Sequence, residues 1–325
     1  PWAMQLLMNM RPEPFERIHH ALLNLNRSSI QSWQQFSNQW QLNDWVHVEG
    51  SLLTVEKVPS LTLLKAHGER LNAIGVTNEL LNKEALLERE PALQDNQLGA
   101  LFFPETGHIT NLDAVINQLS HTFKQLGGHI IEHCRVLEAK TSTDGIHLIT
   151  SQGDMTASKV MLSAGAHSKV LAKQLTNVSV PLDTERGYHL MLPHESARLH
   201  IPVSSMDRRF IMTPMQKGLR LAGTVEYAGL EAPANMQRAQ MLLQQAQPML
   251  KTELNASDKM PWMGFRPSTA DSLPIIDKIG TVFLNFGHQH LGLTQAVVSA
   301  QMIAEYYFDE THTVDPTPYR LARFK

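Results

Sequence analysis

The stretch around Arg266 combines a fixed charge with a stiff backbone. It reads Gly264-Phe265-Arg266-Pro267, and the ring of Pro267 restricts the chain directly after the arginine. Arginine presents a planar, permanently charged group that grips a carboxylate with two parallel hydrogen bonds. Taken alone, an arginine before a proline is more typical of a surface salt bridge. The pattern therefore leaves two interpretations open: a carboxylate-binding arginine on a loop stiffened by proline, or a surface ion pair.

A second chemical feature follows about twenty residues later. The turn Gly287-His288-Gln289-His290-Leu291-Gly292-Leu293-Thr294 joins an expected strand, Thr281–Phe286, to an expected helix, Leu293–Phe308. The start of a helix exposes free backbone N–H groups and carries a partial positive charge, which stabilises a negatively charged ligand. Glycine lets a ligand approach the backbone closely. Histidine by itself says little, because the chain has 16.

Two shorter motifs lie between residues 163 and 189. In Arg186-Gly187-Tyr188-His189, strand alternation sends Arg186 and Tyr188 to one face and His189 to the other. A packed tyrosine on an amphipathic strand and a tyrosine that lines a site both fit this pattern. Ser163-Ala164-Gly165-Ala166 follows an expected buried strand, where the glycine allows a close approach of the backbone to a ligand.

The stretch from Trp262 to Thr294 closely resembles the C-terminal signature of the FAD-dependent D-amino-acid oxidase/dehydrogenase superfamily. Glycine oxidases and related enzymes carry a similar Gly-x-Arg-Pro, followed by an aspartate and an apolar strand such as residues 271–276. Their arginine binds the substrate carboxylate, so the resemblance implies this role for Arg266. Bacterial D-amino-acid and D-hydroxyproline dehydrogenase-like proteins have a similar Arg-Gly-Tyr-His, which implies that Tyr188 lines the substrate pocket.

The same resemblance implies a flavin site. The helix that begins after Gly292 would face the N1/O2 edge of the flavin, and the turn at residues 163–166 would be the second flavin-binding turn. Glycine oxidases have an arginine where this chain has His290, so we count His290 with Arg266 and Tyr188 as a catalytic candidate. The candidate residues for binding FAD are Ala164, Gly165, Gly287, His288, Gly292, Leu293 and Thr294. Related sarcosine oxidases attach flavin through a cysteine within the segment that matches residues 263–276; none occurs there, so we expect non-covalent FAD.

The glycine-rich loop of this superfamily is missing. No position in the chain reads G-x-G-x-x-G, the loop that normally wraps the FAD pyrophosphate. The resemblance otherwise runs from Pro1 to about Phe308, which implies that roughly 80 to 90 residues of the family's N-terminal part are not in this chain (the loop unit itself needs about 30). We therefore expect the 325-residue chain to bind FAD weakly or not at all. A cofactor-free binding or assembly module is the alternative from a different class.

The composition of the chain narrows the remaining classes of function and of binding partner. Hydrophobic residues make up 42% and charged residues 18% of 325, and the net charge is −3, so we expect a folded protein without a nucleic-acid partner. One cysteine, Cys134, fits a reducing compartment. The longest apolar runs fall short of the roughly 20 residues that a transmembrane helix needs. We expect no metal site, because the histidines lack the spacing of a zinc helix. The expected location is cytoplasmic, with peripheral association with the inner membrane as a variant.

The order of the expected helices and strands along the chain predicts a mixed α/β (α+β) fold. In this fold, an incomplete Rossmann-like FAD domain is interleaved with an antiparallel substrate domain. We expect FAD-domain parts at 1–43, 104–177 and 263–325, and substrate-domain parts at 44–103 and 178–262. The expected helices are 13–43, 62–74, 82–90, 111–126, 168–175, 237–250 and 293–308. The expected strands are 46–55, 99–103, 130–139, 146–150, 159–163, 188–192, 209–213, 218–225 and 281–286.

The function that these features favour is oxidation of a D-amino acid, or of a secondary amino acid such as a D-proline derivative, by hydride transfer to FAD. Its product is an imino acid that hydrolyses to a keto acid. The partners would be this substrate and an electron acceptor, a respiratory quinone or oxygen. Within the same class, a glycine- or sarcosine-type oxidase or a tRNA-modification flavin domain remains open.

Overall fold

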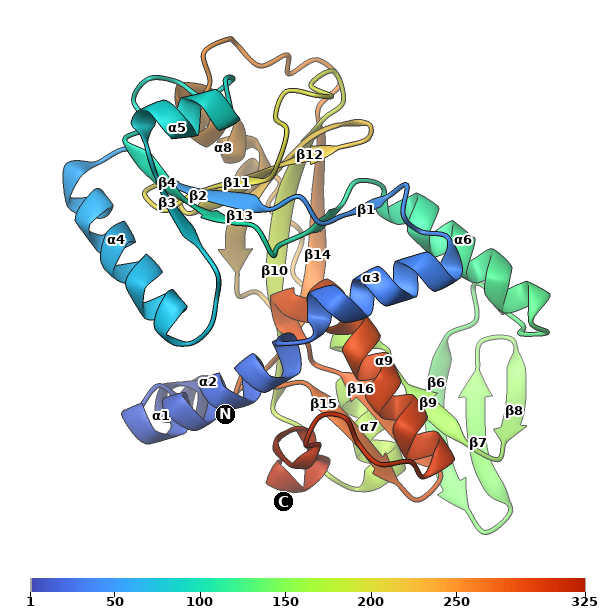
Figure 1. Cartoon of the computed structure of the whole chain (residues 1–325). Helices are drawn as coiled ribbons and strands as arrows, with labels where there is room; N and C mark the ends of the chain where they lie inside the picture. The colour runs from blue at the N-terminus through green and yellow to red at the C-terminus, as the bar shows by residue number, and fades with distance from the viewer. Residues whose placement is uncertain (1, 325) are drawn as a thin grey trace.

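The computed structural model describes residues 2–324 and shows a mixed α/β fold with two main layers of structure (Figure 1). The helices are α1 Trp2–Asn9, α2 Pro12–Asn26, α3 Ser29–Trp40, α4 Val58–Ala73, α5 Lys83–Arg89, α6 Leu112–Gln125, α7 Ser168–Thr176, α8 Gln237–Ala246 and α9 Gly292–Phe308. Short 3-10 helices are η1 Gly165–His167, η2 Gln247–Met249, η3 Gln289–Leu291, η4 Thr317–Tyr319 and η5 Leu321–Phe324. The strands are β1 Val46–His47, β2 Ser51–Val55, β3 Glu79–Asn82, β4 Gly99–Phe103, β5 His108–Ile109, β6 Val136–Ser142, β7 Gly145–Thr150, β8 Gly153–Ala157, β9 Val160–Leu162, β10 Leu182–Leu192, β11 Val203–Ser205, β12 Phe210–Met215, β13 Gly218–Glu226, β14 Met260–Thr269, β15 Ile275–Ile279 and β16 Val282–Phe286.

The upper part of the molecule in Figure 1 is built on an eight-stranded sheet. Its order is β14-β10-β13-β12-β11-β2-β4-β3, and every neighbouring pair is antiparallel except β11 and β2. One face of this sheet packs against α5 and α8 and forms the largest apolar core. Leu190 and Leu192 of β10 and Leu219 and Leu221 of β13 belong to this core. Because side chains alternate along a strand, the residues between these leucines lie on the opposite face.

The lower part contains a smaller sheet with helices on both faces. Its order is β15-β16-β9, with β16 parallel to β9. Leu284 of β16 packs in a core with residues of α7, while its neighbour Phe283 packs with residues of α9 and α2. A sheet that is apolar on both faces is typical of a helix-sheet-helix layer, which agrees with the expected Rossmann-like part.

The elements differ from the sequence prediction in several places. The single helix expected at 13–43 is two helices, α2 and α3, and α1 was not expected. The strand expected at 130–139 begins only at Val136. The expectation that Arg266 lies on a loop was wrong, because the arginine lies inside β14. This strand is at the sheet's edge, where Pro267 does not interrupt an inner ladder. The domain boundary expected between residues 262 and 263 falls within the same strand.

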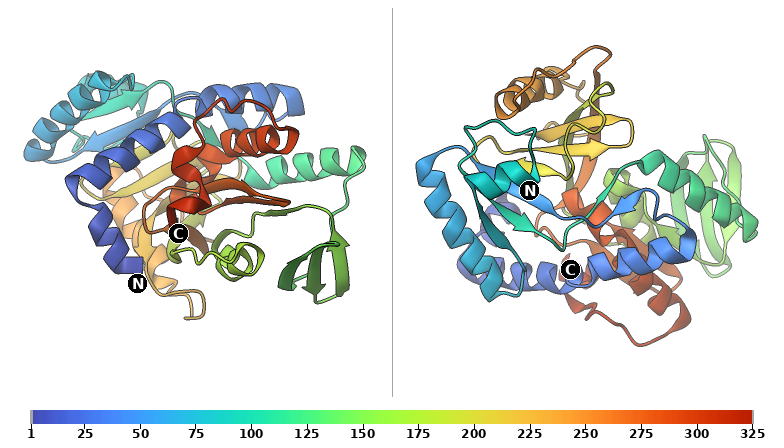
Figure 2. Two further views of the ribbon diagram at one scale, coloured as in Figure 1. Left: turned by 90° about the horizontal axis from the view of Figure 1, so that it is seen from below. Right: turned by 45° about the horizontal axis from the view of Figure 1, so that its top comes forward.

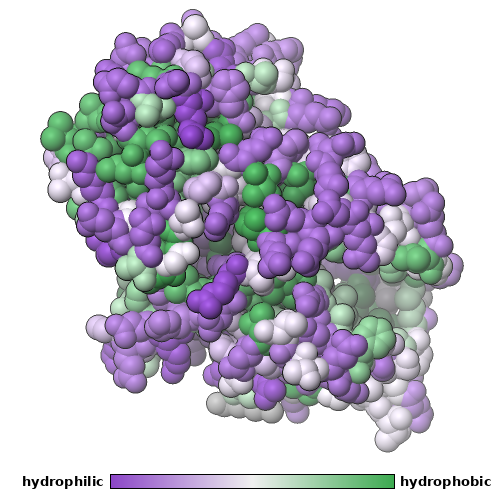
Figure 3. All heavy atoms as spheres, viewed as in Figure 1, coloured by the Kyte–Doolittle hydropathy of each residue, from purple (hydrophilic) through white to green (hydrophobic). Residues whose placement is uncertain are grey.

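Two further views show that the meander β6-β7-β8 projects from the body (Figure 2). The surface seen in Figure 3 is hollowed between the upper and lower parts, and apolar side chains gather over the outer side of the upper part, where α4 lies. Val58 and Leu63 of α4 are exposed there. Between residues 2 and 324, no helix has the length and apolar character needed to cross a membrane.

Candidate active site

The pairing of β10 with β14 positions Arg266. The two strands run antiparallel over ten residue pairs, with Glu185 opposite Arg266, Gly187 opposite Gly264 and His189 opposite Trp262. Directly opposed residues in an antiparallel pair share a face of the sheet. These residues therefore lie on the face away from α5 and α8, turned toward the rest of the molecule.

The guanidinium of Arg266 lies over the backbone of Gly187. A Cβ placed on Gly187 would stand 2.5 Å from the Cζ of Arg266, closer than any real contact. Glycine at this position is what leaves room for the arginine. Burial lowers the pKa of Arg266, while the charge of Glu185 acts in the opposite direction, and at neutral pH the guanidinium stays charged.

No side chain or backbone carbonyl satisfies this guanidinium among residues 2–324. Arg266 makes no hydrogen bond to them, and none of their carboxylates lies within 4.0 Å of it. Structural arginines in the same protein behave differently. Arg186, for example, is fully buried and donates to four backbone carbonyls of residues 228–233. A half-buried charge without a partner is typical of a residue that binds a ligand.

Two other side chains gather beside Arg266. Tyr227 follows β13, and its hydroxyl has a raised pKa because of burial and the nearby charge of Glu185. His290 belongs to η3 at the start of α9; desolvation by the surrounding protein and then the charge of Arg266 lower its pKa. At neutral pH the tyrosine is therefore a protonated hydrogen-bond donor, and the histidine is mainly uncharged. Tyr227 is not among the residues expected from the sequence, because only the pairing of β13 with β10 brings it to Glu185.

Tyr188 lies elsewhere, which corrects the expectation that it lines the substrate pocket. The residue is 1% exposed, its hydroxyl donates to Glu226 at 2.5 Å, and the same hydroxyl accepts the backbone N–H of Asn235 at 3.1 Å. Tyr188 faces the side of the sheet opposite to Arg266, because it alternates with Gly187 and His189 along β10. Its contacts are those of a packed residue that joins β10, β13 and the segment before α8.

The two turns expected to bind FAD meet at one edge of the smaller sheet. Since β9 and β16 are parallel, with Leu162 opposite Leu284, the turns after them lie at the same edge, where α/β proteins bind ligands. Gly165, in the first turn, has a φ of +54° and open space where a Cβ would point. In the second turn, Gly287 has a φ of +85°, which favours glycine.

The second turn also holds a polar atom without a partner. The Nε2 atom of His288 is buried and has no hydrogen-bond partner among the described residues. Burial lowers the pKa of His288 to about 4, so its ring is neutral at pH 7. In the described part of the chain, no side chain caps the start of α9. Gly292 has helical φ and ψ of −54° and −41°, and the remaining two candidates, Leu293 and Thr294, are exposed in its first turn.

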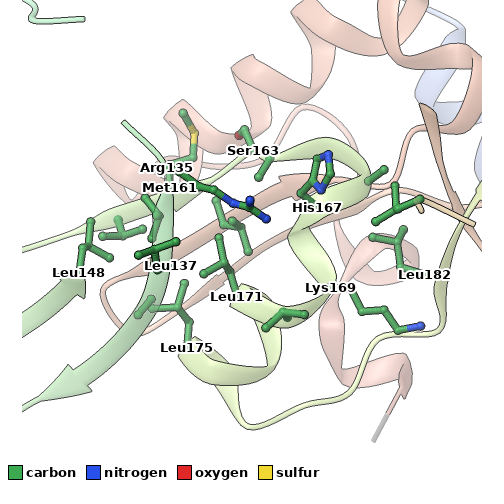
Figure 4. A pocket seen from close by; sticks show the side chains of 18 of the residues that line it. Arg135, Leu137, Leu148, Met161, Ser163, His167, Lys169, Leu171, Leu175 and Leu182 are labelled. Atoms are coloured by element: carbon green, nitrogen blue, oxygen red, sulfur yellow. The ribbon is translucent and has the colours of Figure 1, made fainter. Parts of the chain in front are cut away.

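A cavity of about 1240 Å³ opens beside the first turn (Figure 4). Its walls come from β6, β9 and α7, and the labelled side chains include Leu137, Met161 and Leu171. Ser163 and Ala164 of the first turn line the same space. Its volume exceeds the roughly 300–1,000 Å³ of sites for small organic ligands, so the turn faces enough space for part of a large cofactor.

Comparison with known proteins decides the family. A family model described as FAD dependent oxidoreductase matches residues 6–306. The chain belongs to this family. It is 28% identical over 257 residues to a D-amino-acid oxidase from Bradyrhizobium diazoefficiens, which covers 77% of this chain and 61% of that protein. It is 26% identical over 313 residues to a D-amino acid dehydrogenase from Vibrio atlanticus, over 93% and 74% of the two chains. The crystal structure of glycine oxidase from Geobacillus kaustophilus superposes with a TM-score of 0.81 at 20% identity, covering 93% of this chain and 83% of that one.

As an FAD dependent oxidoreductase, the protein has residues that fit part of its cofactor. The meeting of the two glycine turns, the unpartnered His288 Nε2 and the uncapped start of α9 all suit a large, partly anionic ligand at the edge of the smaller sheet. Gly165 and Ala164 would hold it on one side and residues 287–294 on the other. Arg266 and His290 belong to segments next to this edge, because Ser268 of β14 forms a β-bridge with His288.

Proposed function

We propose that the protein oxidises a D-amino acid, or a secondary amino acid such as a D-proline derivative, to the imino acid. The observation that carries the proposal is the charged Arg266 guanidinium, which lies over Gly187 without a partner among residues 2–324. Its planar group suits the substrate's carboxylate. The names of the two relatives, a D-amino-acid oxidase and a D-amino acid dehydrogenase, support the same substrate class.

The residues on this face would orient the substrate. Arg266 binds the carboxylate, and the phenol of Tyr227, which is protonated at neutral pH, donates a hydrogen bond to it. Glu185, opposite Arg266, places a negative charge near the guanidinium. With the carboxylate held in this way, the Cα–H bond has a fixed direction, and such positioning is the main contribution of the protein in flavin chemistry.

The proposed reaction removes two electrons from the substrate. Cα loses a hydride and the nitrogen loses a proton, so a C=N double bond forms. Water then converts the imine to a keto acid and an amine, which is ammonia for a primary amino acid and stays attached to the opened chain for a proline-type ring. When FAD is bound, it supplies the two-electron acceptor. An amine that arrives neutral needs no side-chain base, so neither Glu185 nor His290, which both stand near Arg266, has to take a proton from it.

The electron acceptor and the location belong to the proposal as well. We propose a respiratory quinone or oxygen as the acceptor, because reduced flavin passes its electrons to either class of compound. We also propose a cytoplasmic location, with peripheral association with the inner membrane as a variant. The single free cysteine, Cys134, supports a reducing compartment.

Anaerobic reduction tests the proposal directly. Because we expect these 325 residues to bind FAD weakly, the chain is first joined to a glycine-rich dinucleotide-binding segment and loaded with FAD. This FAD-loaded enzyme is mixed with D-alanine, D-proline, L-alanine, glycine or sarcosine, and the loss of the oxidised flavin's visible absorption band is followed. Reduction by the D-amino acids, with Arg266→Met slower by about 30- to 1000-fold in kcat/KM, is the expected result. Reduction only by glycine and sarcosine would assign a glycine- or sarcosine-type oxidase. A chain that binds no flavin even with this segment joined to it would favour the cofactor-free alternative.

A further inference from the structure

A second arginine stands on the same face of the large sheet as Arg266. Arg220 of β13 pairs with Met191 of β10, and it therefore shares a face with His189 and Gly187. On the other side of β13, Arg220 is paired with Thr213 of β12. From Gly187, under the Arg266 guanidinium, to Met191 the strand rises about 13 Å at 3.3 Å per residue. The backbone positions of the two arginines thus mark the two ends of one strip of the sheet, and their charged groups lie close enough for the charge of Arg266 to lower the pKa of Arg220.

The middle of the strip is aromatic. The ring of His189 stacks on the indole of Trp262, with centroids 4.7 Å apart and planes 17° from parallel. The indole in turn folds over Gly264, where a Cβ would stand 2.0 Å from the ring. Burial, and then the charge of Arg220, lower the pKa of His189 to about 4, so this middle part is uncharged at pH 7. A ligand that lies along the strip meets a cation, a flat neutral surface and a second cation.

Arg220 has no protein partner among residues 2–324. Its Nε atom is buried without a hydrogen bond, and none of their carboxylates lies within 4.0 Å of its guanidinium. Burial lowers its pKa, and the charge of Arg266 lowers it further. Half-buried arginines elsewhere in the chain are paired, as Arg208 is with Glu56 at 2.6 Å. Such a site leaves a positive charge that a ligand must balance.

Resting on the function proposed above, we propose that the preferred substrate is an acidic amino acid of the aspartate or glutamate type, with its α-carboxylate on Arg266 and its side-chain carboxylate on Arg220. One carboxylate shared by both arginines would leave the strip between them unused. A dianionic substrate instead spans the strip, and its carbon chain lies against the His189–Trp262 pair. Arg220 is then a specificity-determining residue.

The test compares acids with their neutral isosteres in the FAD-loaded enzyme. We expect kcat/KM to be at least ten times higher for D-glutamate than for D-glutamine, and Arg220→Gln to lower this ratio by about 10- to 100-fold. Arg220→Lys should keep part of the preference, because it retains the charge. Arg70→Gln, which removes an exposed charge from α4, is the matched control and should keep the wild-type ratio.

A binding measurement makes the result independent of turnover. By isothermal titration calorimetry, glutarate should bind more tightly than butyrate to the wild type, and Arg220→Gln should abolish the difference. If Arg220→Gln weakens D-alanine, D-glutamine and D-glutamate equally, Arg220 holds the same carboxylate as Arg266 and the proposal is wrong. If Arg220→Gln does not fold, Arg220→Lys and the wild-type comparison of glutarate with butyrate still decide the matter.

The outcomes also separate this proposal from the general function. Oxidation of D-alanine without any preference for D-glutamate or glutarate would overturn only the acidic substrate. Absence of flavin reduction with every amino acid, together with Arg220-dependent binding of glutarate, would overturn the amino-acid oxidation and leave the dianion site in place.

Discussion

The guanidinium of Arg266 occupies the space that a side chain at position 187 would need, with Cζ 2.5 Å from the place of a Cβ on Gly187. The nearest obstacle to a larger residue at 187 is therefore the flexible end of a neighbouring side chain. The backbone at Gly187 also lies outside the left-handed region, so an alanine there is free of backbone strain.

Gly187→Ala should consequently displace Arg266 and leave the protein folded. We expect KM for amino acids to rise about tenfold or more, because one charge-assisted hydrogen bond is weakened, and the melting temperature to change little. Steady-state kinetics and a thermal unfolding curve check both parts. Gly128→Ala, which pushes against the exposed side chain of Phe123 instead, is the control. A Gly187→Ala enzyme with wild-type KM would show that Arg266 does not bind substrate.

Arg266→Lys tests the geometry of the charge. Lysine keeps the charge but cannot form two parallel hydrogen bonds to one carboxylate, so we expect KM to rise by roughly 30- to 1000-fold, or about 2–4 kcal/mol. Kinetics with several amino acids measure the effect. An unchanged KM for all of them would make the arginine part of the scaffold.

Two tyrosines form a matched pair. Tyr188→Phe removes the hydroxyl between Glu226 and Asn235 and should lower the free energy of unfolding by about 1–3 kcal/mol, with KM unchanged. Tyr227→Phe should leave stability within about 0.5 kcal/mol and raise KM roughly 3- to 10-fold. Urea unfolding and kinetics on both variants distinguish them. If Tyr188→Phe raised KM and Tyr227→Phe lowered the free energy of unfolding instead, Tyr188 would be the tyrosine that contacts the substrate.

The start of α9 offers a test of cofactor contact. A Cβ on Gly292 would have one protein neighbour within 4 Å among the described residues, the Cβ of His288 at 3.6 Å, so the space there is open on the protein side. We expect Gly292→Val to fold normally but to lower the reduction potential and to slow flavin reduction about ten- to a hundredfold, because the side chain would intrude on the flavin. Titration against dyes of known potential measures the reduction potential. Wild-type potential in the folded, FAD-loaded variant would place the flavin elsewhere.

Stability should fall in mild acid because of His288. Its pKa is about 4 in the folded protein and about 6.5 when unfolded, so between these values the unfolded state binds more protons. The free energy of unfolding therefore decreases as pH falls through this window, by up to about 1.4 kcal/mol per pH unit from this residue. Urea unfolding at pH 7.5, 6 and 5 should show a smaller decrease for His288→Gln than for the wild type. His20→Gln, an exposed residue, should follow the wild type; equal slopes in all three proteins would contradict the assignment.

The motifs that consist of neighbouring residues could be recognised from the sequence alone. Local patterns were enough to find Arg266, Gly287 and the family. They are the Gly-x-Arg-Pro motif, the glycine turn before the last helix and the mixed order of helices and strands, and each depends on neighbours within a few residues. The Rossmann-like layer was also predictable, because a buried parallel strand reads as a continuous apolar run.

Only the tertiary structure decided which residues stand with Arg266. The choice between Tyr188 and Tyr227 depends on the register of β10 against β13 and β14, and a shift of one residue would exchange the two faces of the strand. Arg220 joins the site only because β13 pairs with the same strand. The sequence could not show this, since such pairings join residues far apart in the chain and form from the packing of the whole sheet against α5 and α8.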